Sequence, residues 1–177
     1  MSDAFSPASS AAHPRLQIIR GLPGSGKSTC ARMRYPDLCH FETDQFCRRN
    51  GAYRWGVARD VDAHSWLDEM VVRCLGFGFD FVVCGVFPTA GHLGRLVRRG
   101  LYSGYDVWIS TLEPNPNYSS IHAVRPADFA KMEKAFVPDS LLEDEFHEME
   151  STVNNGCRVY FGCMVQGTDC VPEPDAR

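Results

Sequence analysis

The sequence predicts an α/β fold built on a parallel sheet with helices on both faces. Two observations support this prediction. Short apolar runs alternate with segments of helical periodicity along residues 15–138, and such alternation is typical of parallel sheets. A glycine-rich loop, G-L-P-G-S-G-K-S-T, stands between the first apolar run and the first helical segment. The composition, 44% hydrophobic and 23% charged, is that of an ordinary globular chain.

Strands are expected where apolar, β-branched or aromatic residues gather in short runs. These runs are Leu16–Arg20, Leu38–Glu42, Phe79–Cys84 and Asp106–Thr111, with Arg158–Phe161 as a further candidate. The first run ends directly at Gly21, so this strand is expected to lead into the glycine-rich loop.

Helices are expected over Ser28–Arg34, residues 57–75, Leu93–Leu101 and Ala127–Phe136. The second has the clearest pattern, because apolar residues recur there at helical spacing and a glycine follows; these residues are Val57, Val61, Leu67, Val71, Leu75 and Gly76. Prolines follow the first and the last helix, and a proline disfavours helical dihedrals in the residue before it. An acidic helix is also expected between Pro138 and about Glu150.

The glycine-rich loop matches the phosphate-binding pattern Gly-x4-Gly-Lys-Ser. Glycines let successive backbone N–H groups approach phosphate oxygens, and the helix that follows adds the positive end of its dipole. Lys27 is expected to contact the β- and γ-phosphates, and Ser28 to bind Mg²⁺. The residues expected to bind ATP are Gly21, Leu22, Pro23, Gly24, Ser25, Gly26, Lys27, Ser28 and Thr29.

Asp44 follows the second expected strand, within the run Phe41-Glu42-Thr43-Asp44-Gln45-Phe46. Ligands of open α/β sheets bind beyond the carboxyl ends of the strands, so Asp44 is expected to face the same crevice as the loop. Its carboxylate is a candidate general base for an attacking hydroxyl and a candidate Mg²⁺ ligand. Asp44 also fits the N-cap of a following helix, and the two interpretations are compatible.

The order of these motifs resembles the kinase domain of 5′-hydroxyl polynucleotide kinases and their small relatives in phages, viruses and animals. The resemblance covers about residues 15–138 and rests on GLPGSGKST, followed by a strand that ends in Thr-Asp-Gln-Phe. Further similarities are Gly51-Ala52-Tyr53, Ala63-His64-Ser65-Trp66, Phe81–Phe87, His122-Ala123-Val124, Met132 and Phe136. The resemblance implies an adenylate-kinase-like P-loop NTPase fold with a short lid. It also implies phosphate transfer from ATP to a hydroxyl, with Lys27 and Asp44 as catalytic residues and Mg²⁺ as the metal.

Three departures from the family pattern bear on turnover. The run Cys84-Gly85-Val86-Phe87 replaces the polar pair that usually follows the third strand. Cys47 stands where the polynucleotide kinases carry an arginine, with Arg48 and Arg49 just beyond it. Ser119-Ser120 stand where lid arginines are expected, and Arg125 is a candidate substitute. Loss of one charge-stabilising arginine slows phosphoryl transfer by roughly 10³–10⁵-fold, so these departures affect turnover more than nucleotide binding.

Two functions follow from this pattern. The first is an ATP- and Mg²⁺-dependent kinase that phosphorylates a 5′-hydroxyl nucleic-acid end or a small-molecule acceptor. The second is a divergent nucleotide-binding protein that serves as an interaction or regulatory module without useful turnover. The intact loop and Asp44 favour the first function, whereas the departures favour the second.

The chain is expected to divide into a disordered leader over residues 1–14, a P-loop kinase-like domain over residues 15–138 and an acidic extension over residues 139–177. The extension contains DSLLEDEFHEME, which has six acidic and no basic residues and is a candidate surface for a protein partner. Residues 1–138 carry a small basic excess, which fits a small anionic ligand better than a long duplex. The leader lacks the features of a secretory signal, and no apolar run is long enough to span a bilayer. A cytoplasmic or nuclear location without membrane contact is therefore expected.

Several other residues have competing interpretations. His64 is expected to pack in the core or on its helix rather than act in catalysis, and the segment Tyr53–Trp55 to pack in a hairpin rather than stack on a base. Arg95, Arg98 and Arg99 are expected on a solvent-exposed helix face, with contact to a nucleic-acid backbone as the alternative. The eight cysteines occur singly, without a common zinc-ligand spacing, so reduced thiols are expected.

Overall fold

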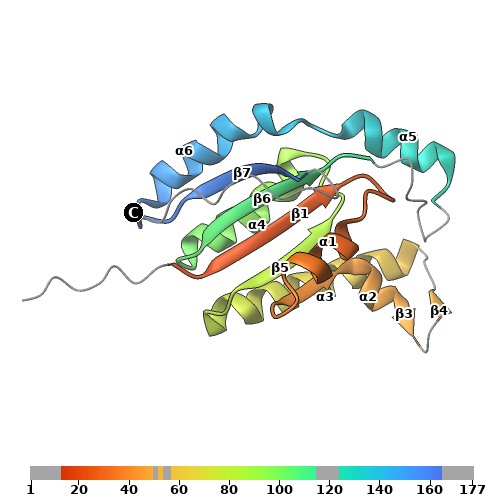
Figure 1. The fold of residues 1–177 in the computed structure, drawn as a ribbon, viewed down its shortest axis with the longest axis horizontal. Coiled ribbons are helices and arrows are strands. Elements are labelled where there is room, and N and C mark those ends of the chain that lie inside the picture. The colour runs from red at the N-terminus through yellow and green to blue at the C-terminus, as the bar shows by residue number, and fades with distance from the viewer. Residues whose placement is uncertain (1–12, 50–51, 54–56, 115–123, 165–177) are drawn as a thin grey trace, which may run out of the picture.

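The computed structural model describes residues 13–49, 52–53, 57–114 and 124–164, and it places them in a central sheet with helices on both faces (Figure 1). All neighbouring strands of this sheet run parallel, in the order β2-β5-β1-β6-β7. The strands are β1 (Arg15–Gly21), β2 (Cys39–Glu42), β5 (Phe81–Gly85), β6 (Asp106–Leu112) and β7 (Val159–Met164). A separate antiparallel pair consists of β3 (Arg48–Arg49) and β4 (Ala52–Tyr53).

Helices of the described part cover both faces of the sheet. They are α1 (Lys27–Arg34), α2 (Thr43–Cys47), α3 (Val57–Phe77), α4 (Ala90–Tyr102), α5 (Pro126–Ala135) and α6 (Glu143–Val153), with a short 3₁₀ turn η1 (Asp139–Leu141). The helix α1 packs on one face, whereas α3, α4 and α6 pack on the other. Figure 1 shows α1 in front of the sheet and α4 behind it.

The main hydrophobic core lies between the sheet and the helices α3, α4 and α6. Its strand residues are Leu16, Ile18, Phe81, Val83, Val107 and Ile109, and its helix-side residues include Leu67, Val71, Leu93, Val97, Leu101, Leu142 and Phe146. A smaller cluster lies under α1 and consists of Ile19, Ala31, Val82, Cys84 and Leu112. Because β1 and β5 are buried on both faces, neither sequence alternates between apolar and polar residues; β5 is apolar throughout, whereas β1 also buries Gln17 and Arg20.

The strand order creates a switch point next to β1. From β1 the chain builds β2 and β5 on one side of this strand, and then crosses to build β6 and β7 on the other side. Ligands of open α/β sheets bind beyond the carboxyl ends of the strands at such a point. The loop that leaves β1 therefore lies where a ligand is expected to bind.

The strands and helices expected between residues 15 and 161 are all present, and most bounds shift by up to three residues. The acidic helix begins later than expected, at Glu143, with the 3₁₀ turn η1 before it. The helix α4 begins earlier than expected, because the Thr89 side chain caps it by accepting a hydrogen bond from the backbone N–H of His92. The expected apolar stripe of α3 is wrong at one position. Val61 is 65% exposed, since the buried stripe passes through Ala63, Leu67 and Val71.

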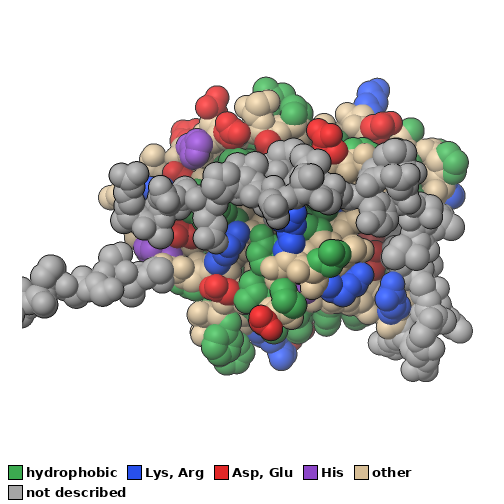
Figure 2. All heavy atoms as spheres, in the orientation of Figure 1, with side chains coloured by type: hydrophobic (Ala, Val, Ile, Leu, Met, Phe, Trp, Pro, Cys, Tyr) green, Lys and Arg blue, Asp and Glu red, His purple; other side chains and the backbone are tan. Residues whose placement is uncertain are grey.

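Residues 139–164 pack on the same sheet and core as the residues before them. Phe146 of α6 is fully buried in the main core, and β7 pairs with β6 at the edge of the sheet. Asp144, Glu145 and Glu148 of α6 are exposed, and Figure 2 shows acidic groups along the edge where Figure 1 places this helix. Of the expected leader, only His13 and Pro14 are described. Within the described ranges, none of the helices combines the length and the apolar character that a bilayer span requires.

Candidate functional site

The loop between β1 and α1 turns tightly at the carboxyl edge of the sheet. The backbone N–H of Ser25 donates to the carbonyl of Leu22 at 3.1 Å, and that of Cys30 donates to the carbonyl of Gly26 at 2.9 Å. Gly26 is the N-cap of α1 with a φ of 84°, a left-handed conformation that strains residues with a side chain. The positive end of the α1 dipole therefore lies at the loop, where an anion is stabilised.

The Lys27 side chain folds over the loop. Its Nζ donates to the carbonyl oxygens of Gly21 and Leu22, each at 2.9 Å, and lies 3.5 Å from Ser25 Oγ. Burial lowers the pKa of Lys27, and the nearby Cys84, Glu42 and Asp44 oppose this shift. A phosphate oxygen would form a charge-assisted bond to this ammonium group, which is stronger than its present bonds to neutral carbonyls.

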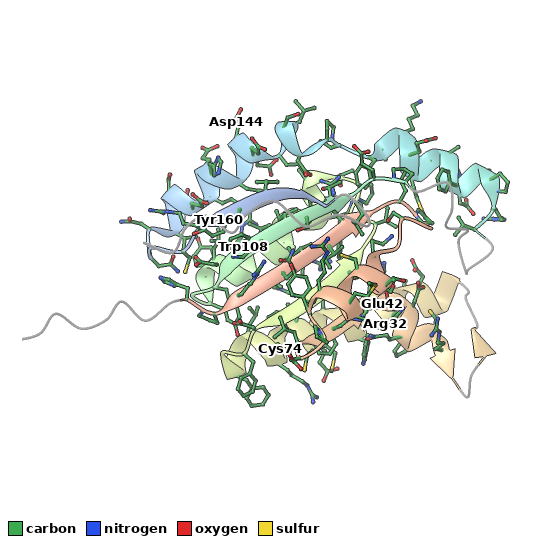
Figure 3. The ribbon with its side chains drawn as sticks, in the orientation of Figure 1. Arg32, Glu42, Cys74, Trp108, Asp144 and Tyr160 are labelled. Carbon is green, nitrogen blue, oxygen red and sulfur yellow. The ribbon has the colours of Figure 1, made fainter. Side chains whose placement is uncertain are left out.

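Ser28 of α1 lies against the end of β2. Its hydroxyl donates to the carboxylate of Glu42, the last residue of that strand. His40 Nε2 lies 3.8 Å from the same carboxylate oxygen. Burial lowers the pKa of His40 below its usual 6.5, so the imidazole is neutral at pH 7. Figure 3 labels Glu42 and Arg32 next to each other at α1, and both side chains act on the pKa of His40.

Asp44 lies in the first turn of α2, directly after β2. Its charge is near enough to Lys27 to oppose the lowering of the lysine pKa, so the structure brings Lys27, Ser28 and Asp44 to one edge of the sheet. The alternative interpretation of Asp44 as an N-cap is wrong, because Glu42 occupies the N-cap position of α2. A carboxylate in a first turn is favoured instead by the helix dipole.

Two residues that differ from the family pattern, Cys47 and Cys84, are buried in apolar surroundings. Cys47, in the place of the expected arginine, is 2% exposed, and Arg48 beside it is exposed at the start of β3. Cys84 lies under α1, with its Sγ 3.9 Å from the carbonyl oxygen of Lys27. Burial raises the pKa of this thiol well above its usual value, so it is neutral at pH 7.

The backbone adopts an unusual conformation just beyond the end of β5. Phe87 has a φ of 41°, a left-handed conformation that is uncommon for a bulky residue. A side-chain carbon placed on Gly85 would lie 2.6 Å from the Phe87 ring. The phenyl ring thus packs directly on the Gly85 backbone, which only a glycine permits.

Two residues that the sequence analysis did not single out have clear structural roles. Glu42 contacts Ser28, and its position as the last strand residue before Asp44 was a signal that could have identified it, since strand ends face the crevice. Arg20, at the end of β1, is fully buried and bonds to Val137 and Asp139. The residues that precede it in the sequence, Leu16–Ile19, did not indicate this contact.

The other candidate residues lie on the surface or outside the described residues. His64, expected to pack in the core or on its helix, is not a core residue: its side chain is 56% exposed and lies 3.9 Å from Asp60, one turn earlier on α3. Arg95 and Arg99 form ion pairs with Asp68 of α3, as a solvated helix face would. The Tyr53 side chain and the whole of Trp55 lie outside the described residues.

The segment expected to form a lid is partly described. Ser119-Ser120 and His122-Ala123 lie outside the described residues. Arg125 immediately precedes α5, is exposed, and forms an ion pair with Asp128 at 2.7 Å. Its guanidinium is therefore held at the start of α5.

No group of three or more histidine, cysteine or acidic residues with metal-binding geometry occurs among the described residues. Of the eight cysteines, Cys170 and the Cys163 side chain lie outside the described residues. Oxygen donors at the loop, by contrast, are of the type that Mg²⁺ prefers. Ser28, Glu42 and Asp44 supply such donors within one short stretch of the sheet edge.

Comparisons with known proteins agree with this architecture. The chain is 37% identical to the uncharacterized protein PM0531 of Pasteurella multocida over 114 residues, which is 55% of this chain and 64% of that protein. A structure from the PezAT toxin–antitoxin system of Streptococcus pneumoniae superposes with a TM-score of 0.61 at 16% identity, covering 93% of this chain and 72% of that one. The AvrRxo1-ORF1:-ORF2 complex with ATP gives 0.60 at 13% identity, covering 91% and 57%.

A third structure, from the Pnkp1/Rnl/Hen1 RNA repair complex, gives a TM-score of 0.50 at 16% identity and covers 84% of this chain and 48% of that one. No family model matches the chain. The chain thus spans less than two thirds of its curated relative and of two of these three structures. Together with the strand order and the loop, these likenesses confirm the expected P-loop NTPase fold with an adenylate-kinase-like parallel sheet.

Proposed function

We propose that this protein is an ATP-binding P-loop kinase that transfers the γ-phosphate of ATP to a hydroxyl acceptor, as polynucleotide kinases do. One observation carries the proposal. Lys27, Ser28 and the Asp44 carboxylate meet at the carboxyl edge of the sheet, beside the N-terminus of α1. Phosphoryl transfer needs positioning and charge stabilisation more than covalent chemistry, and this arrangement supplies both.

The nucleotide is bound by residues Gly21–Thr29. Backbone N–H groups of the loop and the α1 dipole receive the phosphates, and Lys27 exchanges its carbonyl partners for β- and γ-phosphate oxygens. Ser28 and one nearby carboxylate, for which the sequence offers Asp44, provide oxygen ligands for Mg²⁺, which when bound neutralises charge on the β- and γ-phosphates.

The Asp44 carboxylate acts as the general base. It accepts the proton of the acceptor hydroxyl while the hydroxyl oxygen forms a bond to the γ-phosphorus. The bond between this phosphorus and the β,γ-bridging oxygen breaks, and its electron pair leaves with ADP. The Lys27 ammonium stabilises the charge that develops on the transferred group.

The acceptor that we propose first is a 5′-hydroxyl nucleic-acid end, and the second is a small-molecule hydroxyl. The resemblance to polynucleotide kinases supports the first, as does a fold neighbour that belongs to an RNA repair complex. The exposed Arg125 at the start of α5 is the proposed substitute for the lid arginines.

Transfer of label from γ-labelled ATP to 5′-hydroxyl DNA and RNA oligonucleotides, nucleosides and sugars tests the proposal. We expect one acceptor to be labelled, and Asp44→Asn to reduce that rate by about 10²–10⁴-fold while ATP binding by calorimetry is retained. Asp37→Asn, an exposed carboxylate in the turn before β2, is the matched control and should leave the rate unchanged. Full transfer by Asp44→Asn would refute the assignment of the base.

A second candidate function is nucleotide-dependent regulation without useful turnover. The observation that favours it is the burial of Cys47, which leaves no arginine at the position where polynucleotide kinases carry one. A protein partner is proposed for this function on the exposed acids of α6, since two fold neighbours come from a toxin–antitoxin system and a two-component complex. Magnesium-dependent ATP binding without transfer to any acceptor would favour this function over the first.

A further inference from the structure

Glu42 occupies a position in the site that the proposed function has not used. It ends β2 and pairs in register with Cys84 of β5, the strand next to β1. Its side chain therefore lies beneath the first turn of α1, where its carboxylate accepts the hydroxyl proton of Ser28. At 15% exposure, the carboxylate is largely shielded from solvent.

Glu42 has Arg32 of α1 nearby, since both act on the pKa values of His40 and Cys84, but the loop itself contributes its cation, Lys27, elsewhere. The Lys27 ammonium is near enough for Glu42 to affect its pKa, yet its hydrogen bonds go to Gly21, Leu22 and Ser25. A carboxylate in poor contact with water strongly favours a nearby cation. A second positive charge at the Ser28 hydroxyl would meet that requirement.

The contact of Ser28 indicates which carboxylate would lie nearest to a bound metal ion. In phosphate loops of this type, the hydroxyl after the lysine binds the divalent cation that accompanies the nucleotide. The carboxylate that touches this hydroxyl is therefore nearest to the cation, and in this chain it belongs to Glu42. Asp44 lies two residues further on, in the first turn of α2.

We propose that Glu42 and Ser28 together hold the divalent cation, and that Asp44 serves only as the base for the acceptor hydroxyl. This inference rests on the proposed ATP-binding function and assigns its two carboxylates separate roles. On cation binding, the Ser28 oxygen turns its lone pairs to the metal, and Glu42 binds the metal directly or through one of its waters. A carboxylate of this kind typically changes metal affinity by about 10–100-fold.

Calorimetric titration of ATP with and without Mg²⁺ tests the inference without measuring transfer. For Glu42→Gln, which keeps an oxygen that can accept from Ser28 but removes the charge, we expect metal-free ATP affinity to be unchanged or higher. The enhancement by Mg²⁺ should fall at least tenfold. Asp44→Asn should keep the enhancement, and Glu69→Gln, an exposed carboxylate on α3, is the matched control.

Binding of Mn²⁺ to the protein–ATP complex, measured by electron paramagnetic resonance, gives a second readout. Glu42→Gln and Ser28→Ala should each weaken Mn²⁺ binding, and their double variant should lose less than the sum, because both act on one cation. Glu42→Asp, which keeps the charge, should retain part of the binding and shows that the site still folds.

The outcomes separate this inference from the function on which it rests. If the wild-type protein binds ATP with Mg²⁺ enhancement and Glu42→Gln does the same, the inference is wrong and the proposed function stands. If Asp44→Asn rather than Glu42→Gln loses the enhancement, the two roles must be exchanged. If the wild-type protein binds no ATP, both proposals fail.

Discussion

The guanidinium of Arg20 lies 3.4 Å from the carboxylate of Asp139, a residue 119 positions further along the chain. The same guanidinium donates to the carbonyl of Val137 at 2.6 Å and lies 4.1 Å from the centre of the Phe136 ring. Asp139 also accepts a hydrogen bond from the Thr111 hydroxyl at 2.7 Å. Arg20 immediately precedes the phosphate loop, so this contact joins the loop strand to the segment that follows α5.

Replacement of Arg20 should destabilise the protein substantially. Its side chain is 0% exposed, and removal of one partner from a buried ion pair typically lowers the free energy of unfolding by about 3–5 kcal/mol. We expect Arg20→Ala to show a loss in that range in denaturant unfolding, and Asp139→Asn a smaller one, because the amide can still accept from Thr111. Arg98→Ala, an exposed arginine on α4, is the control and should change little. Equal losses for Arg98 and Arg20 would contradict the buried contact.

Lys27→Met should separate stability from nucleotide binding. Removal of the ammonium relieves its desolvation but also loses its bonds to the loop carbonyls, so the two effects should offset and change the unfolding free energy of the ligand-free protein by only about 1 kcal/mol. The rise in melting temperature caused by Mg²⁺ and ATP should disappear, because the charge that contacts the phosphates is lost. A variant that still shows the full ATP-dependent rise would contradict the role of Lys27.

The pH dependence of stability provides an independent check on Lys27. Its pKa in the folded protein lies below the usual 10.5, because burial disfavours the ammonium form. Between these two values the unfolded chain binds more protons than the folded one, so this group makes stability rise with pH across that window. The difference in unfolding free energy between wild type and Lys27→Met should therefore shift in favour of the wild type as pH rises towards 10.5. A difference that is independent of pH would show that the lysine titrates normally.

The fold could be predicted from the sequence because short local patterns identify most of its strands and helices. Short runs rich in apolar residues identified β1 and β5, and the Gly-x4-Gly-Lys-Ser spacing placed the phosphate loop between β1 and α1. The exposure of His64 could also have been predicted, since Ala63 and Leu67 define the buried stripe of α3 and His64 lies beside this stripe.

The remaining features depend on contacts between distant parts of the chain. The role of Glu42 arises because β2 pairs with β5, which brings its carboxylate to Ser28, and no short pattern encodes this pairing. Likewise, the sequence around Arg20 is that of a solvent-exposed strand end, and only its contacts with Val137 and Asp139 show that it is buried. Long-range topology thus decided the environment of both charged residues.

Gly85→Ala should destabilise the protein through a steric conflict with Phe87. The added carbon would lie 2.6 Å from two atoms of the phenyl ring, and overpacking of this kind typically lowers the unfolding free energy by about 1–3 kcal/mol. Phe87→Leu in the Gly85→Ala background should recover part of the loss, which a double-mutant cycle would measure. Gly76→Ala, near the end of α3 with no atom within 4 Å of the added carbon, is the matched control and should be neutral or stabilising.

The cysteines should differ widely in reactivity although all of the described ones are reduced. Cys39 is exposed at the start of β2, whereas Cys84 is 1% exposed and burial raises the pKa of its thiol well above the usual value. Alkylation followed by peptide mass spectrometry should therefore modify Cys39 more than about a hundredfold faster than Cys84, because access to a core thiol requires an opening that costs several kcal/mol. In denaturant the two rates should converge. Fast modification of Cys84 in the native protein would mean that α1 does not cover the end of β5, and the proposed packing of the phosphate loop would then be wrong.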